Sequence, residues 1–149
     1  MRHALAGVNP ASALVVALSG GADSLALAAA VAFESRAFTQ KPVSITIDHG
    51  LQDGSDAVAT SAAEAAQKLG FTARTVAVSV EESDGGLEAA ARDARYKALF
   101  ASTREAGATT LILGHTLDDQ AEAVLLGLAR GAGATSLQGM PPVAKRDGI

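Results

Sequence analysis

The chain has 149 residues, which suits a single compact domain with one buried core. It contains no cysteine, and this excludes disulfides, thiolate zinc sites and cysteine-based catalysis. The formal net charge of -4 gives no electrostatic case for nucleic-acid binding by this domain alone, and no run reaches the roughly 20 apolar residues of a membrane helix. We therefore expect a cytoplasmic protein that has no membrane partner.

Short β-rich runs alternate with longer alanine-rich helical patterns along the whole chain. We expect strands at 13–18, 43–47, 72–80 and 110–113. We expect four helices. The first runs from after residue 24 to about 38, the second from 55 to 69 with Gly70 as its C-cap, the third from after a turn at 81–86 to about 106, and the fourth from 117 to 130. A glycine-rich loop is expected over 131–142. This alternation predicts an α/β fold with a parallel sheet sandwiched by helices, Rossmann-like, for which the usual strand order is 3-2-1-4.

Three polar clusters each follow directly after an expected strand. In an open parallel sheet these positions share one edge, where ligands bind. The clusters are residues 19–24, the pair Asp48 and His49, and residues 115–119. We therefore expect a single site at the carboxyl edge of the sheet.

The first cluster has the composition of an anion-binding loop. Paired glycines let backbone amides approach a phosphate, hydroxyls can donate to it, and a helix N-terminus follows. It lacks the lysine of the Walker A pattern, and Asp23 suggests a Mg²⁺ between the carboxylate and a polyphosphate. The alternative is a Gly-Gly turn in which Asp23 or Ser24 caps the helix. The residues in order are Ser19, Gly20, Gly21, Ala22, Asp23 and Ser24.

Each remaining candidate also has an ordinary structural explanation. Arg92 can neutralise a phosphate, or it can pair with Glu88 on a solvated helix face. His115 can donate to an oxygen or shuttle a proton, or it can be structural. Asp118 suits a helix cap, which leaves Asp119 to act on metal or substrate.

The second-strand pair has the same two readings. Asp48 and His49 follow the second strand, beside the place where an adenosine is expected to lie. The alternative for Asp48 is a turn-forming residue before Gly50.

The loop motif and three further segments carry a family resemblance. The string at 19–24 matches the S-G-G-x-D-S motif of the PP-loop ATP pyrophosphatases, an adenine nucleotide α-hydrolase-like fold. The segments at 48–51, 87–96 and 114–122 are similar to those of one member family, the tRNA(Ile)-lysidine synthetases. The resemblance also includes 128–133 and 139–142, so it covers nearly the whole chain.

The resemblance implies a carbon-nitrogen ligase that uses ATP and Mg²⁺. Its substrates would be L-lysine and an isoleucine tRNA with a CAU anticodon, whose wobble cytidine is adenylated at C2 before the lysine amine displaces AMP. Asp23, Arg92, His115 and Asp119 would be catalytic, Asp23 would hold Mg²⁺, and residues 19–24 with Asp48 and His49 would bind ATP. We expect a fragment whose tRNA-binding region lies beyond residue 149.

Other functions stay open at this stage. A tRNA thiolation enzyme also adenylates a base, but such enzymes rely on cysteines. Amidotransferase-type and related adenylating synthetases share the loop motif without the 115–122 segment. A nucleotide-binding module without catalysis is the third alternative. The oligomeric state and the lysine pocket are also left open.

Overall fold

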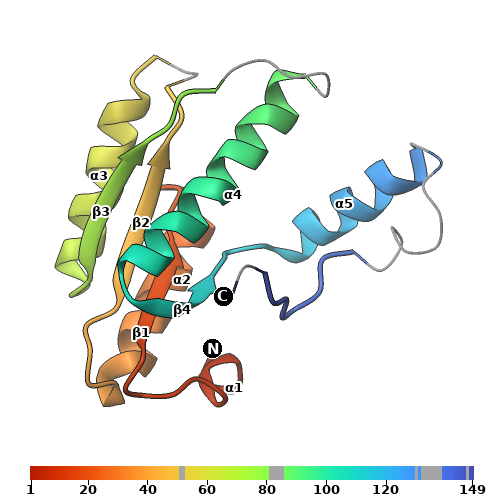
Figure 1. Ribbon diagram of the computed structural model, residues 1–149. Helices are drawn as coiled ribbons and strands as arrows, with labels where there is room; N and C mark the ends of the chain where they lie inside the picture. The colour runs from red at the N-terminus through yellow and green to blue at the C-terminus, as the bar shows by residue number, and fades with distance from the viewer. Residues whose placement is uncertain (51–52, 81–85, 130, 132–138, 147) are drawn as a thin grey trace.

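Four strands and their helices alternate along the chain. The computed structural model describes residues 1–50, 53–80, 86–129, 131, 139–146 and 148–149. The elements, which can be followed in Figure 1, are α1 (Arg2–Leu5), β1 (Ala13–Ala17), α2 (Ala22–Glu34), η1 (Ser35–Ala37), β2 (Val43–Asp48), α3 (Ser55–Lys68), β3 (Thr72–Ala77), α4 (Leu87–Glu105), β4 (Ala108–Ile112) and α5 (Leu117–Ala129). The predicted α/β alternation is confirmed.

The sheet has the expected strand order. Its four strands are arranged β3-β2-β1-β4, and every neighbouring pair is parallel. Val15 of β1 is in register with Val43 of β2 on one side and with Leu111 of β4 on the other. Because β1 is flanked by both strands, the loop after β1 is flanked by the loops after β2 and β4.

Helices cover both faces of the sheet. On one face, Leu14 and Val16 of β1 pack with Val31 of α2 and Ala62 of α3. On the other face, Leu99 of α4 packs in a cluster that contains Val15, Val43 and Ile45. Alternate residues of a strand point to opposite faces, so β1 contributes to both cores. The many alanines of α2 and α3 allow these helices to lie close to the sheet.

Several element bounds differ from the sequence expectation. The third strand ends at Ala77 instead of residue 80, because the last ladder bond is from the Val78 N–H to the Asp48 oxygen, where β2 ends. The fourth strand begins earlier, at Ala108, which pairs with Ala13. The short helix α1 was not predicted. The predicted turn at 81–86 and the loop at 131–142 fall largely outside the described residues.

Two hydroxyl groups on β2 are buried. Ser44 and Thr46 are 0% and 3% exposed, on the face opposite to Val43 and Ile45. Neither hydroxyl has a hydrogen-bond partner among the residues that the structure describes. A buried polar group without a partner usually costs stability, so these two positions are weak points of the core.

Helix α5 extends away from the sheet and packs little against it (Figure 1). None of its residues is buried, and Leu117, Leu125 and Leu128 are 84%, 64% and 53% exposed. The described part of the chain contains no helix that is both long and apolar enough to cross a membrane.

Candidate functional site

The glycine loop, residues 19–24, connects the end of β1 to the first turn of α2. Gly20 has φ 86°, in the left-handed region where a side chain is strained. Gly21 is the N-cap residue of α2, and Asp23 lies exposed in the first helical turn. The loop amides and the positive end of α2 therefore meet at the carboxyl edge of the sheet, as the sequence predicted.

The buried Ser24 side chain makes hydrogen bonds with two other residues of the glycine loop. Its hydroxyl donates to the Gly21 carbonyl oxygen at 2.9 Å. It accepts the backbone N–H of Ser19 at 3.2 Å and the Ser19 hydroxyl at 3.1 Å. Ser24 is only 6% exposed, whereas Ser19 is exposed.

Helix α3 and the loop after β4 both lie close to the glycine loop. A Cβ atom on Gly20 would lie 3.2 Å from Cγ1 of Val58, which belongs to α3. A Cβ atom on Gly114, just after β4, would lie 3.6 Å from the Ser24 Cα and 3.3 Å from Cδ2 of Leu27. A side chain at residue 114 would therefore be in contact with the first turns of α2, so the loop after β4 runs close to the glycine loop at Gly114.

A charged groove lies beside this contact, between α4 and α5. Its volume is about 350 Å³. Its walls carry two guanidinium groups, two carboxylates and two imidazoles, together with apolar side chains. The lining residues are His49, Ala91, Arg92, Arg95, Tyr96, His115, Asp119, Glu122, Ala123, Leu126 and Met140.

The groove brings together four of the residues that the sequence predicted, His49, Arg92, His115 and Asp119. Asp23 and Asp48 do not line it. The candidate site therefore has two parts, the glycine loop and the charged groove, which meet at Gly114.

Two arginines of the groove flank one aromatic ring. The Cζ atoms of Arg92 and Arg95 lie 5.8 and 5.5 Å from the ring centroid of Tyr96, within the range of cation-π attraction. Tyr96 also contacts Phe100, with the ring centroids 6.1 Å apart. This aromatic support holds two positive charges at one end of the groove. Glu88, the predicted ion-pair partner of Arg92, has a side chain outside the described part of the structure.

His115 lies between charges of both signs. Partial burial and the positive charge of Arg95 lower its pKa, Asp119 raises it, and Arg92 lowers it further. The net direction is downward from the ordinary value of 6.5. The imidazole is therefore neutral at physiological pH and can accept a proton.

Asp119, and not Asp118, makes the cap of α5. Its Oδ2 accepts the Thr116 N–H at 2.6 Å and the Thr116 hydroxyl at 2.9 Å, while the Asp119 N–H donates to the Thr116 hydroxyl oxygen at 3.1 Å. This is the reciprocal pattern of a capping box. The hydrogen bonds from Thr116 lower the pKa of Asp119. The expectation that Asp118 caps the helix and leaves Asp119 unengaged is wrong, although Asp119 still lines the groove.

Asp48 forms a local turn, which was the alternative interpretation of this residue. Its Oδ1 accepts the Gly50 N–H at 3.0 Å. Hydrogen bonds from the Ser55 hydroxyl and from Gly50 lower its pKa. His49, next in the chain, lines the groove instead. Leu51, the last residue of this predicted motif, lies outside the described residues.

Sequence reasoning missed Arg95 and gave Glu122 no separate role. Arg95 follows Arg92 by three residues, so both side chains share a helix face, and this spacing alone could have found it. Glu122 follows Asp119 by the same interval. Met140 reaches the groove because the Gln120 side-chain amide donates to its carbonyl oxygen and accepts its N–H, both at 2.7 Å.

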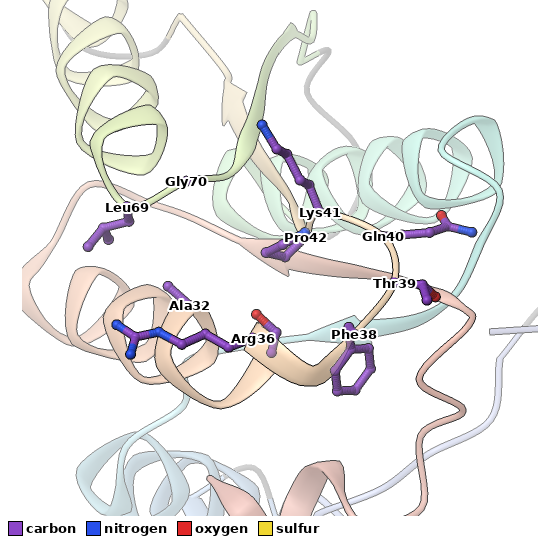
Figure 2. A pocket seen from close by; sticks show the side chains of 10 residues that line it. Ala32, Arg36, Phe38, Thr39, Gln40, Lys41, Pro42, Leu69 and Gly70 are labelled. Atoms are coloured by element: carbon purple, nitrogen blue, oxygen red, sulfur yellow. The ribbon is translucent and has the colours of Figure 1, made fainter.

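A second hollow, of about 230 Å³, lies at the opposite edge of the sheet (Figure 2). Arg36 and Lys41 line it, but Figure 2 shows their side chains pointing in different directions. Arg36 lies 4.8 Å from the ring centroid of Phe33. Thr39, also at this hollow, donates its hydroxyl to the Pro10 oxygen at 3.1 Å. The side chains here are engaged locally, and helix C-termini favour cations, so we assign no site to it.

The described part of the chain contains no preformed metal site. Among the described residues, no group of three or more His, Asp or Glu side chains could hold a metal ion. Mg²⁺ commonly uses one or two carboxylates together with substrate phosphates and water, so the lone exposed carboxylate of Asp23 fits that ion only when a polyphosphate accompanies it.

Comparison with known proteins gives a consistent set of relatives. Residues 2–149 match the family described as the PP-loop domain. The tRNA(Ile)-lysidine synthase of Streptomyces coelicolor is 50% identical over 142 residues, which cover 95% of this chain and 40% of that protein. The corresponding synthase of Nocardia farcinica is 56% identical over 146 residues, which cover 94% of this chain and 44% of that protein.

A solved structure has the same fold. It is the U34-tRNA thiolase NcsA from Methanococcus maripaludis with its 4Fe-4S cluster, at a TM-score of 0.73 and 21% identity, covering 91% of this chain and 50% of that one. At this identity the likeness shows the fold alone. The chain spans about two fifths of the length of the synthases that it matches.

Proposed function

Because the chain belongs to the PP-loop domain family, we propose that it is the ATP-binding part of a tRNA(Ile)-lysidine synthase. The proposed reaction starts with attack of the C2 oxygen of the wobble cytidine on the α-phosphorus of ATP, which releases pyrophosphate. The amine of L-lysine then attacks C2, and AMP leaves with the oxygen. The identity of 50–56% to synthases from Streptomyces coelicolor, Salinispora arenicola and Nocardia farcinica across most of this chain supports the proposal.

The observation that carries the proposal is the contact between the two parts of the site. Gly114 is so close to Ser24 that an added Cβ atom would lie 3.6 Å from the Ser24 Cα, and the next residue, His115, lines the charged groove. An ATP held by the loop would therefore present its α-phosphate beside the groove. Adenylation requires this arrangement, because the base must reach that phosphorus.

The glycine loop suits the polyphosphate of ATP. Backbone amides and the N-terminus of α2 supply partial positive charge, and a glycine at residue 20 lets the backbone approach the anion. Asp23 would hold Mg²⁺ against the phosphates, and the ion would supply positive charge to the departing pyrophosphate.

The groove suits the adenylated base and the amino acid. Arg92 and Arg95 would stabilise negative charge on the α-phosphate and on the leaving AMP. Glu122 and Asp119 give the groove carboxylates that complement an ammonium group. Neutral His115 can take the proton that the lysine amine loses when it attacks C2.

Thiolation is not the function that we propose. The relatives that match at high identity carry the lysidine synthase name, while the thiolase resembles this chain only in fold. The 149 residues also contain no cysteine to carry sulfur.

The test is lysine transfer in a full-length setting. Residues 1–149 would replace the matched part of the Streptomyces coelicolor synthase, and the chimera would be incubated with Mg-ATP, labelled lysine and isoleucine tRNA transcripts. We expect label only in the transcript with C at the wobble position, not in one with U, and one AMP and one pyrophosphate per lysine. An inactive chimera beside an active parent synthase, with no AMP formed, would remove the lysidine assignment.

Asp23→Asn provides the matched site variant. We expect it to abolish pyrophosphate release in the chimera while leaving the circular dichroism spectrum and the unfolding midpoint unchanged. Asp53→Asn removes an exposed carboxylate before α3 and should retain activity. Full activity of the Asp23 variant would refute the metal role.

A further inference from the structure

Ser24, the last residue of the glycine loop, has used all of its hydrogen-bonding capacity. A serine hydroxyl has one proton to donate and two lone pairs to accept with. The Gly21 carbonyl can only accept, so the Ser24 proton points to it. The Ser19 N–H can only donate, so it occupies one lone pair. The Ser19 hydroxyl at 3.1 Å must then donate to the other.

This accounting leaves Ser24 no bond to give to a phosphate. We propose that Ser24 is a positioning residue that fixes the glycine loop in its ATP-binding shape, and that the phosphate contacts come from the other residues of the loop. The proposal rests on the ATP-binding role put forward above. The same arrangement restricts the Ser19 hydroxyl. Its proton is donated to the Ser24 oxygen, so Ser19 can only accept a hydrogen bond from a ligand.

The burial of Ser24 supports the same role. The side chain is 6% exposed, while Ser19, Gly21 and Asp23 of the same loop are exposed. To reach a ligand, the Ser24 hydroxyl would have to give up its bond to the Gly21 oxygen. The bonds that it makes connect the last residue of the loop to Ser19 and to Gly21, on either side of the left-handed turn at Gly20. A loop that is held in shape before ATP arrives loses less entropy on binding.

The test compares Ser24→Thr with Ser24→Val. The two side chains have nearly the same shape, and only threonine keeps the hydroxyl. The first readout is hydrogen exchange of the Ser19 amide in the protein without ATP. We expect exchange about tenfold faster in the valine variant and near wild type in the threonine variant, since tenfold corresponds to the loss of one hydrogen bond.

The second readout is the split between KM and kcat in the synthase chimera. Because Ser24 does not touch the reacting atoms, the valine variant should raise KM for ATP about tenfold and leave kcat within about threefold. The threonine variant should restore KM. Ser24→Ala carries the same predictions without an added methyl group, in case the larger side chains do not fit.

Two outcomes would overturn the proposal. Weaker ATP binding with unchanged Ser19 exchange in the ATP-free valine and alanine variants would mean that the hydroxyl contacts phosphate directly. A valine variant equal to wild type in both readouts would mean that Ser24 has no role in the loop. Failure of the wild-type chain to bind ATP would count against the proposed function instead, and the exchange measurement would still decide whether Ser24 braces the loop.

Discussion

Gly20→Ala tests whether the glycine loop needs a residue without a side chain. At φ 86°, an L-residue pays a left-handed penalty of about 1–2 kcal/mol, partly offset by about 0.4–1 kcal/mol from the less flexible unfolded chain. The new Cβ would also lie 3.2 Å from the Val58 Cγ1, and such overpacking costs about 1 kcal/mol or more. We expect Gly20→Ala to lose about 2 kcal/mol in total.

Gly70→Ala is the matched control. Gly70 has φ 95° at the end of α3, and a Cβ there meets nothing within 4 Å. It should therefore show the left-handed penalty alone, about 1 kcal/mol. Adding Val58→Ala to Gly20→Ala should recover the difference, because Val58 is 55% exposed and contributes little by itself.

Urea unfolding measures all three changes. With a slope of about 2 kcal/mol per M, Gly20→Ala should move the midpoint by about 1 M and Gly70→Ala by about half of that. ATP binding should weaken only in the Gly20 variant. Equal losses at the two glycines, with no recovery by Val58→Ala, would refute the crowding argument, and unchanged ATP affinity would refute the role of the loop.

Three further predictions concern the groove and the core. Arg95→Gln should raise the pKa of His115 in an NMR titration, because the positive charge of Arg95 lowers it. A folded-state pKa below the unfolded value of 6.5 means that His115 makes the folded protein lose stability as the pH falls below 6.5. An unchanged His115 pKa in the variant would contradict the influence of Arg95. Thr46→Val removes a buried hydroxyl without a partner and should stabilise the fold by about 1 kcal/mol in calorimetry, whereas a loss would reveal a missed bond. Gln120→Ala breaks both bonds to Met140, so exchange of the Met140 amide should accelerate; unchanged protection would show that other contacts hold this segment.

The alternation of strands and helices follows from patterns within single segments, whereas the strand order rests on the arrangement that is usual in such sheets. Alternating strand and helix periods predicted four βα units, and the polar residues after the strands predicted one site edge. The structure has the four units and places the ends of β1, β2 and β4 at one edge of the sheet, and the site at that edge stays a prediction. Apolar runs predict where a strand lies but not where the neighbouring strand ends. β3 ends at Ala77 because its partner β2 ends at the paired residue, Asp48, and the sequence pattern therefore placed the end of β3 too late, at residue 80.

The roles of individual site residues were harder to predict, because they depend on geometry between segments. Asp118 and Asp119 are equivalent as sequence letters, but only Asp119 follows Thr116 by the three residues of a capping box. Asp48 accepts the Gly50 N–H in a local turn and does not line the groove, whereas its neighbour His49 does. The full use of the Ser24 hydroxyl depends on distances that no sequence pattern contains.

The central position of β1 also has a consequence for synthesis on the ribosome. Ala13 of β1 pairs with Ala108 of β4, so the first strand of this sheet waits for the fourth to be made. At roughly 5–20 residues per second, that wait is roughly 5 to 20 s. Until Gly114 has left the exit tunnel, the glycine loop lacks its contact at Ser24. The nascent chain therefore makes its first 113 residues with this edge of the sheet incomplete, and a stop codon anywhere before residue 114 would yield a product that lacks Gly114 beside Ser24.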